Sequence, residues 1–382
     1  MTNHLINKSA CLLITSLIIV FPVFSQTSKP ENIDIKIRKA GNTFPVEIIK
    51  RITLLPIEFK PDAMINRIAK VQFDGTRYYL LNEIDGSTQN MIMTSKDGKI
   101  DQVLNRKGKG PGEYQLILDF NVDPVKKELW IFDGGKQLYS VYSPDLKFLR
   151  SFPTNKEFTP GSFLFTPWDS QSIVINSSEI DRKAGKMFNT LSIVKNETAA
   201  KMLLNLGEIL SDQGGGLFCL QGLADAIDFW PPFSSDIIRI NEAGCHPVYH
   251  ITFDEPTVKP GTLITSSMHP EVFAQSFYES DSYVLIRFMI SNKVYLTFYH
   301  KKTHQVTTIQ NPWNSKTDEG FLFHLLGFVG NKLVLNAINL DLREVISKLD
   351  PAGSKLADKN MLDKIDPASQ FSNPILVFVE ME

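Results

Sequence analysis

The stretch Arg106-Lys-Gly-Lys-Gly-Pro-Gly-Glu-Tyr114 separates two segments that carry the same order of apolar runs and turns. Aspartates mark the turns before it, at Asp74 and Asp97, and after it, at Asp123 and Asp145. Asp74 and Asp123 are 49 residues apart, and Asp97 and Asp145 are 48 residues apart. A period near 50 residues built only from strand patterns is typical of a β-propeller. The stretch is therefore expected to join two blades.

The composition is that of an ordinary globular protein with ample apolar material for a large core. The chain has 382 residues, of which 43% are hydrophobic and 21% are charged, and its formal net charge is −2. A closed repeat array keeps such a length in one domain. The near-neutral balance and the absence of a basic block argue against nucleic acid as the main partner.

The N-terminus has the pattern of a secretory signal peptide, expected over residues 1–25. Lys8 supplies a positive start, Ala10–Phe24 is apolar, and small residues stand one and three positions before Gln26. The apolar run is short for a membrane span, so we expect no integral membrane protein. Cys11 stands at the start of this run and not after it, which argues against a lipoprotein. The mature chain is expected to start at Gln26 and to be exported, to the periplasm or beyond.

After a polar leader over residues 26–50, strand patterns continue to the C-terminus, so we expect a propeller over residues 51–382. Each unit combines apolar runs of strand length with turn residues between them. The six expected blades are 68–102, 118–152, 163–206, 217–253, 276–309 and 325–382.

The last unit differs from the others. Residues 341–364 have helical spacing interrupted by Pro351 and Gly353, which leaves this unit three strands of its own. Ile52–Phe59 reads as an edge strand because it carries a proline, and it is the natural fourth strand. The predicted fold is an all-β, six-bladed β-propeller whose last blade is closed by an N-terminal strand and contains a helical insertion.

Several motifs resemble the secreted bacterial six-bladed β-propeller family, which is related in architecture to NHL-repeat and TolB-like propellers. The motifs are Gly108–Tyr114, the turn at Asp145, Pro232–Ile240, His246–Tyr249 and Asn373–Val377. The resemblance implies a six-bladed ring and export. It brings no catalytic residues to transfer, because most members of that family have no assigned function.

The loop Arg106–Tyr114 is also the first candidate binding site, with Arg106, Lys107, Lys109 and Tyr114 as its residues of interest. Loops between blades open on one face of a propeller, around the channel, and that face commonly carries binding. Glycines allow backbone N–H groups to converge on an anion, and the three cations add charge. The alternative, which we favour, is a rigid blade junction in which Tyr114 packs inside.

Aromatic residues give a second candidate. Trp230 and Phe233 flank a Pro-Pro pair in an expected loop, and Trp168 and Trp313 also fall in expected loops. Exposed aromatic rings near a channel can stack on sugars, and buried ones fill gaps between blades. Both interpretations remain open for Trp230 and Phe233.

The sequence gives no convincing metal or thiol chemistry, so we expect no cofactor. The pairs His246/His250 and His300/His304 have zinc-like spacing but fall in a strand and a turn. The alternative that a calcium ion binds in the central channel stays open, although no Asp-rich loop supports it. Cys219 and Cys245 are expected as small buried side chains in neighbouring strands, and a disulfide between them stays open.

The favoured function is an exported, non-catalytic binding or scaffold protein that uses its channel face for a small molecule, a glycan or a protein. The alternative is a lactonase-like hydrolase or lyase with a metal in the channel. Three or more Asp, Glu, Asn or His side chains that converge in the channel would favour this enzyme.

Overall fold

The computed structural model describes most of the chain. The described residues are 29–85, 88–153, 165–167, 172–181, 186–195, 198–209, 219–223, 226–231, 234–241, 244–258, 271–291, 293–310, 324–337, 342–357, 359–364 and 373–382. The predicted signal peptide and its cleavage site lie outside them, as do Trp168, Phe233 and Trp313.

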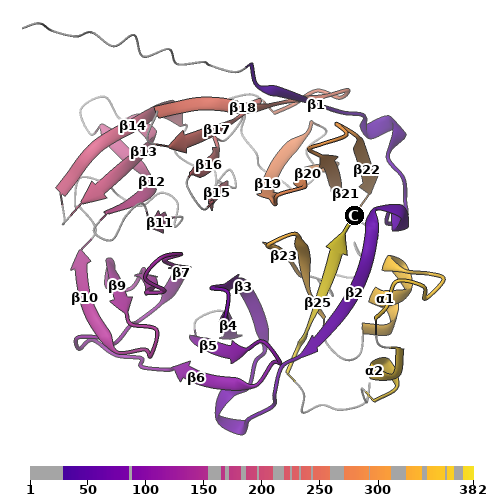
Figure 1. Ribbon diagram of the computed structural model, residues 1–382. Coiled ribbons are helices and arrows are strands. Elements are labelled where there is room, and N and C mark those ends of the chain that lie inside the picture. Colours follow the sequence, from indigo (N-terminus) through magenta and orange to yellow (C-terminus); the bar gives the residue numbers. More distant parts are fainter. Residues whose placement is uncertain are drawn as a thin grey trace, which may run out of the picture.

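Within these residues the strands form six sheets arranged around a central axis, which makes the protein an all-β propeller with few helices (Figure 1). The first three sheets in chain order are four-stranded. They contain β3 (Arg67–Phe73), β4 (Arg77–Asp85), β5 (Thr88–Ser95) and β6 (Ile100–Leu104); β7 (Ile117–Val122), β8 (Leu129–Asp133), β9 (Leu138–Tyr142) and β10 (Phe148–Pro153); and β11 (Phe165–Pro167), β12 (Ser172–Asp181), β13 (Lys186–Lys195) and β14 (Thr198–Ile209).

The other three sheets include both ends of the described chain. They contain β15 (Cys219–Gly222), β16 (Ile227–Trp230), β17 (Asp236–Asn241), β18 (Gly244–Phe253) and β1 (Glu31–Ile35); β19 (Phe273–Glu279), β20 (Tyr283–Ile290), β21 (Lys293–His300) and β22 (Val306–Gln310); and β23 (His324–Val329), β24 (Lys332–Ala337), β25 (Ile375–Met381) and β2 (Ile49–Pro56).

One edge strand of each sheet lies nearest the centre of the ring (Figure 1). These inner strands contact one another in the order β3, β7, β11, β15, β19 and β23, and β23 contacts β3 again. Apolar side chains fill the spaces between neighbouring sheets, for example between β19–β22 and the C-terminal sheet. The core is therefore a series of layers between sheets, which is how a propeller buries both faces of each blade.

The repeated aspartates hold turns, as their recurrence predicts. Asp74 Oδ1 accepts hydrogen bonds from the backbone N–H groups of Thr76 and Arg77 at the β3–β4 turn. Asp123 Oδ1 accepts from the N–H groups of Val125 and Lys126 at the β7–β8 turn. An aspartate that bonds its own backbone in this way stabilises a tight turn.

Strand β2 closes the C-terminal sheet, as predicted for Ile52–Phe59. It is the edge strand of the order β2–β25–β24–β23 and pairs antiparallel with β25, with Thr53 opposite Phe378. Its proline, Pro56, stands at the end of the strand, where the missing N–H costs little. The strand β2 from the N-terminal part of the chain and the C-terminal strand β25 thus meet in one sheet.

The helical insertion lies between β24 and β25 and covers the outside of that sheet (Figure 1). Its helices are α1 (Leu342–Leu349) and α2 (Lys359–Lys364). The apolar residues of α1 are buried in the core cluster that contains Ile52. Residues 355–357 then bond both backbone groups of Ile52, the N–H to Lys355 O and the C=O to Ala357 N. The insertion therefore caps an edge that would otherwise be open.

Asp350 holds the turn after α1 and makes this region sensitive to acid. Its carboxylate accepts from the N–H groups of Ser354 (3.0 Å), Lys355 (2.6 Å) and Leu356 (3.2 Å). Burial tends to raise the pKa of Asp350, but these hydrogen bonds outweigh it and lower the pKa.

A lowered pKa means that Asp350 stabilises the fold fully above its unfolded-state pKa of about 3.9 and loses this contribution as the pH falls further. Urea unfolding between pH 3 and 7 should show that Asp350→Asn is less stable at neutral pH and that the difference shrinks in acid. A difference that is constant with pH would contradict this.

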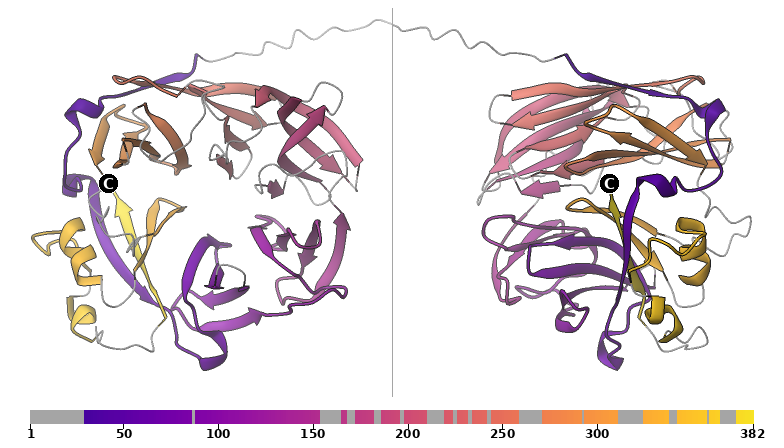
Figure 2. Two further views of the ribbon diagram at one scale, coloured as in Figure 1. Left: turned by 180° about the vertical axis from the view of Figure 1, so that it is seen from behind. Right: turned by 45° about the vertical axis from the view of Figure 1, so that its right-hand side comes forward.

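Over the described residues 31–50, the segment expected as a polar leader is built into the fold. Strand β1 pairs in parallel with β18, and Ile33 and Ile35 are fully buried. Gly41 then bonds the backbone of β22 through Thr308 O and Gln310 N. The segment runs along the outside of the ring from β18 past β22 to β2 (Figure 2). A five-residue parallel strand has too weak a local signal to be read from sequence.

Candidate functional site

The loop Arg106–Tyr114 is closed by its own hydrogen bonds. Gly108 N donates to Tyr114 O (2.8 Å), and Tyr114 N donates to Arg106 O (3.0 Å). Gly110 N donates to the Glu113 carboxylate (2.7 Å), and Glu113 N donates back to Gly110 O (3.1 Å). Four N–H groups that could have held a foreign anion are therefore occupied by the loop itself.

Tyr114 anchors the loop inside the protein. Only 1% of its surface is exposed, and its hydroxyl donates to Gln89 O (2.9 Å) and Leu104 O (3.2 Å). Burial raises the pKa of Tyr114 to about 12, so the phenol keeps its proton at neutral pH. Tyr114 is a packing residue, which agrees with the junction interpretation, and it offers no surface to a ligand.

The loop packs against the sheet β7–β10. Lys136, in the β8–β9 turn, donates from Nζ to Gly110 O (3.0 Å) and Glu113 O (2.9 Å). Tyr142 on β9 donates its hydroxyl to Gly112 O (3.3 Å), and a Cβ on Gly112 would approach Phe148 of β10. These contacts reach the middle and outer strands of that sheet. They give no support to the expectation that the loop lies at the channel.

Gly112 is required by both its conformation and its surroundings. Its φ is +70°, and an added Cβ would lie 2.7 Å from the Phe148 Cβ. We expect Gly112→Ala to destabilise the protein by about 1–3 kcal/mol in urea unfolding. Gly75→Ala is the matched control, since Gly75 has φ +96° but open space around it. Equal losses in the two variants would mean that the contact with Phe148 is unimportant.

The three cations of the loop remain at the surface. The side chains of Arg106, Lys107 and Lys109 are exposed, and none makes a hydrogen bond or ion pair with another described residue. The expected ligand-binding set thus divides into a buried anchor, Tyr114, and three exposed cations.

Of the two aromatic candidates, Trp230 is described by the structure, and it is buried. Trp230 is 4% exposed, its Nε1 donates to Ser234 O (2.9 Å), and its ring meets Phe277 of the next sheet edge to face. Trp230 therefore fills the gap between sheets, and the stacking interpretation is wrong for it. Phe233 lies outside the described residues.

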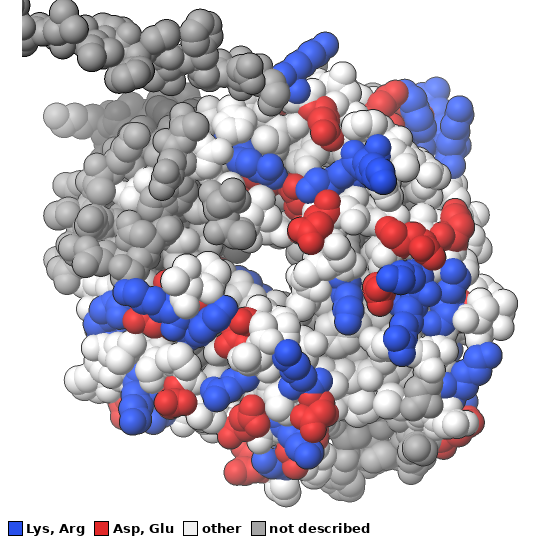
Figure 3. Space-filling model, viewed as in Figure 1, with Lys and Arg blue, Asp and Glu red and all other residues white. Residues whose placement is uncertain are grey.

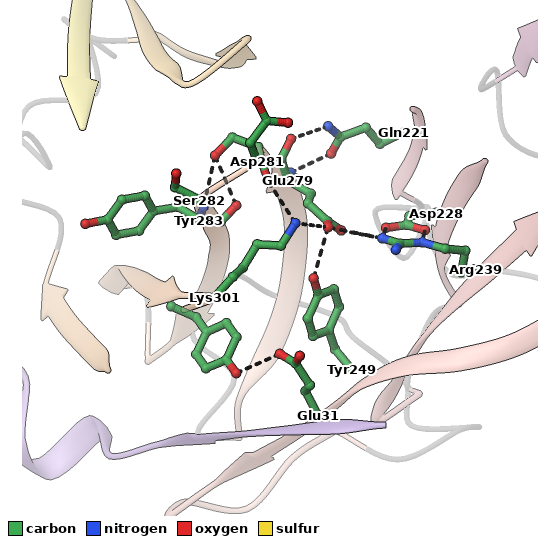
Figure 4. Close-up of polar contacts among 12 residues, drawn as sticks. Glu31, Gln221, Asp228, Arg239, Tyr249, Glu279, Asp281, Ser282, Tyr283 and Lys301 are labelled. Atoms are coloured by element: carbon green, nitrogen blue, oxygen red, sulfur yellow. Dashed lines mark hydrogen bonds and ion pairs between the residues drawn. The ribbon is translucent and has the colours of Figure 1, made fainter. Parts of the chain in front are cut away.

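A buried charge cluster that the sequence did not single out joins the sheet of β15–β18 to the sheet of β19–β22 (Figure 4). We name it the Glu279 cluster: Asp228, Arg239, Tyr249, Glu279 and Lys301. The Arg239 guanidinium donates to both Asp228 oxygens (2.7 Å each) and to Glu279 (3.0 Å). Glu279 also accepts from Lys301 Nζ (2.6 Å) and from the Tyr249 hydroxyl (2.9 Å). Two carboxylates and two cations are thus matched.

The cluster shifts the pKa of its members in opposite directions. Burial raises the pKa of Asp228, whose side chain is fully buried, and hydrogen bonds from Arg239 oppose this rise. Burial also tends to raise the pKa of Glu279, but its hydrogen bonds and the charges of Arg239 and Lys301 outweigh it and lower the pKa. A signal existed in the sequence: Asp228 and Arg239 are charged residues inside apolar strand patterns.

Polar side chains also tie the inner strands together around the ring. Lys70 of β3 donates from Nζ to Asp119 Oδ1 of β7 (2.7 Å), and Gln72 Nε2 donates to Asn121 Oδ1 (2.7 Å). Asn121 Nδ2 in turn donates to Phe165 O of β11. Between β15 and β19, Gln221 exchanges two hydrogen bonds with the backbone of Glu279, both 2.7 Å. These side chains serve the contacts between sheets.

Two of the described histidines, His250 and His304, contact neighbours in their own hairpins. His250 Nδ1 lies 2.6 Å from Asp236 Oδ1, and His304 Nδ1 lies 2.6 Å from the Tyr299 hydroxyl oxygen. Among the residues that the structure describes, no group of three His, Cys, Asp or Glu side chains gathers at metal-binding distance.

The expectation for the cysteines needs correction. Cys245 is exposed on β18, so it is not a buried side chain. Strands β16 and β17 lie between it and Cys219 on β15. At about 4.8 Å per strand, the two Cα atoms are farther apart than the roughly 7 Å that a disulfide allows.

The face shown in Figure 3 is hollowed at its centre, and acidic and basic side chains both occur around the opening. No helix among the described residues is long and apolar enough to cross a membrane.

The fold and the packing of the ring define the protein as a β-propeller. Residues 31–380 match the model of the domain of unknown function DUF4934, and the chain belongs to this family. The match includes β1, in agreement with its place in the fold. No curated protein matched the sequence.

Two solved structures have a similar fold. One is a protein from Bacteroides fragilis with a provisional description as exported, 15% identical, with a TM-score of 0.72 over 92% of this chain and 99% of that one. The other is a member of the DUF4221 family from Bacteroides vulgatus, 8% identical, with a TM-score of 0.51 over 87% of this chain and 98% of that one. At these identities the likeness concerns the fold alone.

Proposed function

We propose that this protein is an exported, non-catalytic, six-bladed propeller that acts as a binding or scaffold protein. Each of the six sheets is one blade, and the contacts of the inner strands around the full ring support this count. The signal-like N-terminus and the provisional description of the Bacteroides fragilis protein as exported support export.

One observation supports a binding role above catalysis: the buried ionisable groups are used to hold the sheets together. Glu279 and Asp228 are neutralised by Arg239 and Lys301, and Asp119 is bonded to Lys70. Carboxylates that are paired with neighbouring cations in this way are poor candidates for metal ligation. The cations of the loop, by contrast, are exposed and have no described partner. Arg106, Lys107 and Lys109 are the proposed ligand-binding residues, and the ligand is an anion.

A thermal-shift screen of the mature protein tests this function, because a ligand that binds only the folded state raises the melting temperature. Anionic small molecules and glycans should raise it, and neutral analogues should not. The variant Lys107→Ala/Lys109→Ala should lose the shift while its own stability stays within about 0.5 kcal/mol of the parent. A shift by Ca²⁺ or Zn²⁺ together with lactone hydrolysis would instead support the enzyme.

A further inference from the structure

The backbone of the loop Arg106–Tyr114 is unsuited to hold a small anion. Such anions are commonly bound by successive N–H groups that point into one concavity. Here the N–H groups of Gly108, Gly110, Glu113 and Tyr114 all bond within the loop. The Glu113 carboxylate lies where a concavity would be, since a Cβ on Gly108 would come within 2.1 Å of its Oε2. Recognition is therefore expected to come mainly from side chains.

The side chains of the loop present unbalanced positive charge. Its one acidic residue, Glu113, is turned inward onto Gly110, and the cations Arg106, Lys107 and Lys109 are exposed. Elsewhere Lys70 and Lys301 are ion-paired with buried carboxylates. A local charge of this sign is notable in a chain whose formal net charge is −2, and it attracts anions over about a Debye length, roughly 10 Å at 0.1 M salt.

The loop is also held rigidly. Tyr114 fixes one end through two hydrogen bonds, and Lys136 fixes the middle through Gly110 O and Glu113 O. Asp133, which is fully buried, accepts from the N–H groups of Gln115 and Leu116 just beyond it. The charged side chains start from a fixed backbone, so a ligand does not have to order the loop itself.

We propose that Arg106, Lys107 and Lys109 form a binding surface for a linear polyanion, an acidic polysaccharide that carries carboxylate or sulfate groups. This inference rests on the proposed function and specifies its ligand. Each exposed ion pair contributes little, so a monomer binds weakly, and a chain with repeated charges engages several cations at once. The large apolar side chains exposed among the described residues are Phe59, Met64, Val125 and Leu149, none of them in the loop. The surface therefore offers nothing to insert into a membrane.

The test is binding of the mature protein to immobilised polygalacturonate and heparin by biolayer interferometry, at 50 to 300 mM NaCl. We expect the dissociation constant to rise steeply with salt. In Lys107→Ala/Lys109→Ala/Arg106→Ala it should rise about tenfold or more at low salt, the sum of three exposed pairs. Polygalacturonate carries carboxylates alone and heparin carries both carboxylates and sulfates, so tighter binding to heparin would show that sulfate contributes.

The matched control removes the same charge elsewhere. Lys293, Lys302 and Lys332 are exposed on the sheets of β19–β22 and β23–β25, and their triple Ala variant should bind like the parent. Equal weakening in both variants would overturn the proposal, because attraction would then come from net charge alone.

Two further outcomes separate this inference from the proposed function. If galacturonate monomer binds as tightly as the polymer, the inference of a polyanionic ligand is wrong. The proposed function as an anion-binding protein would then still stand. Vesicles of phosphatidylglycerol and phosphatidylethanolamine that bind when both polymers fail would overturn it in favour of a membrane surface. If neither polymer, monomer nor vesicle binds, the inference and the assignment of the loop as an anion site both fail.

Discussion

A chain that lacks residues 49–56 is expected not to form a closed ring. Strand β2 supplies the outer strand of the C-terminal sheet, and Ile52 lies fully buried in the core cluster with Val377 and Val379. Without it the edge of β25 and the apolar residues of α1 lose their partner. The expected result is a protein that is unfolded or aggregated, as judged by circular dichroism and gel filtration.

A single substitution tests the same role of β2 in a protein that still folds. Ile52→Ala should lower the free energy of unfolding by about 2–5 kcal/mol, the usual cost of truncating a buried Ile. Arg51→Ala, an exposed neighbour on the same strand, should change it by less than about 0.5 kcal/mol. A deletion variant with a near-native melting temperature, or equal effects of the two substitutions, would show that β2 does not close the ring.

Arg239→Met should destabilise the protein by about 3–5 kcal/mol. The change leaves Asp228, which is fully buried, without its cation, and it removes one of the two cations on Glu279. A buried charge that loses its partner costs far more than a surface pair is worth. Arg343→Met is the control, because its pair with Asp363 is long (3.7 Å) and exposed.

The pH dependence gives a second readout for Arg239→Met. Loss of the cation raises the folded-state pKa of the two carboxyls, so the destabilisation should be larger at neutral pH and should shrink in acid. Adding Asp228→Asn to Arg239→Met should recover part of the loss, since the buried charge is gone. A loss that is independent of pH and is not relieved by Asp228→Asn would mean that Arg239 acts through packing alone.

The propeller could be predicted because its signals are local and repeated. Turn aspartates such as Asp74 and Asp123 recur with one period, and the apolar runs between them have strand length. The closing strand was also accessible, since Ile52–Phe59 has a strand pattern and the last unit lacked one. Strand β1 was missed because its partner β18 is remote in the chain and its apolar pattern rests on Ile33 and Ile35.

The site was harder to predict because exposure is a property of the fold. Tyr114 and Trp230 have the same side chains whether they face a ligand or fill a gap, and only the packing of neighbouring sheets puts both inside. The Glu279 cluster depends on residues from β16, β17, β18 and β19 and on Lys301, which follows β21, and no spacing in the sequence relates them. The charges of Arg106, Lys107 and Lys109 were visible from the start, and the structure adds that they remain exposed.

The pairing of β2 with the C-terminal strand β25 has a consequence for the time course of folding. Lys50 and Glu380, which form an ion pair across β2 and β25, are 330 residues apart in the chain. Residues 49–56 emerge early and have to wait for the last strand before they find their partner. Closing so long a loop is entropically costly, and contacts of high sequence separation slow folding. We therefore expect ring closure to be a late and slow step, before which unpaired strand edges are exposed to aggregation.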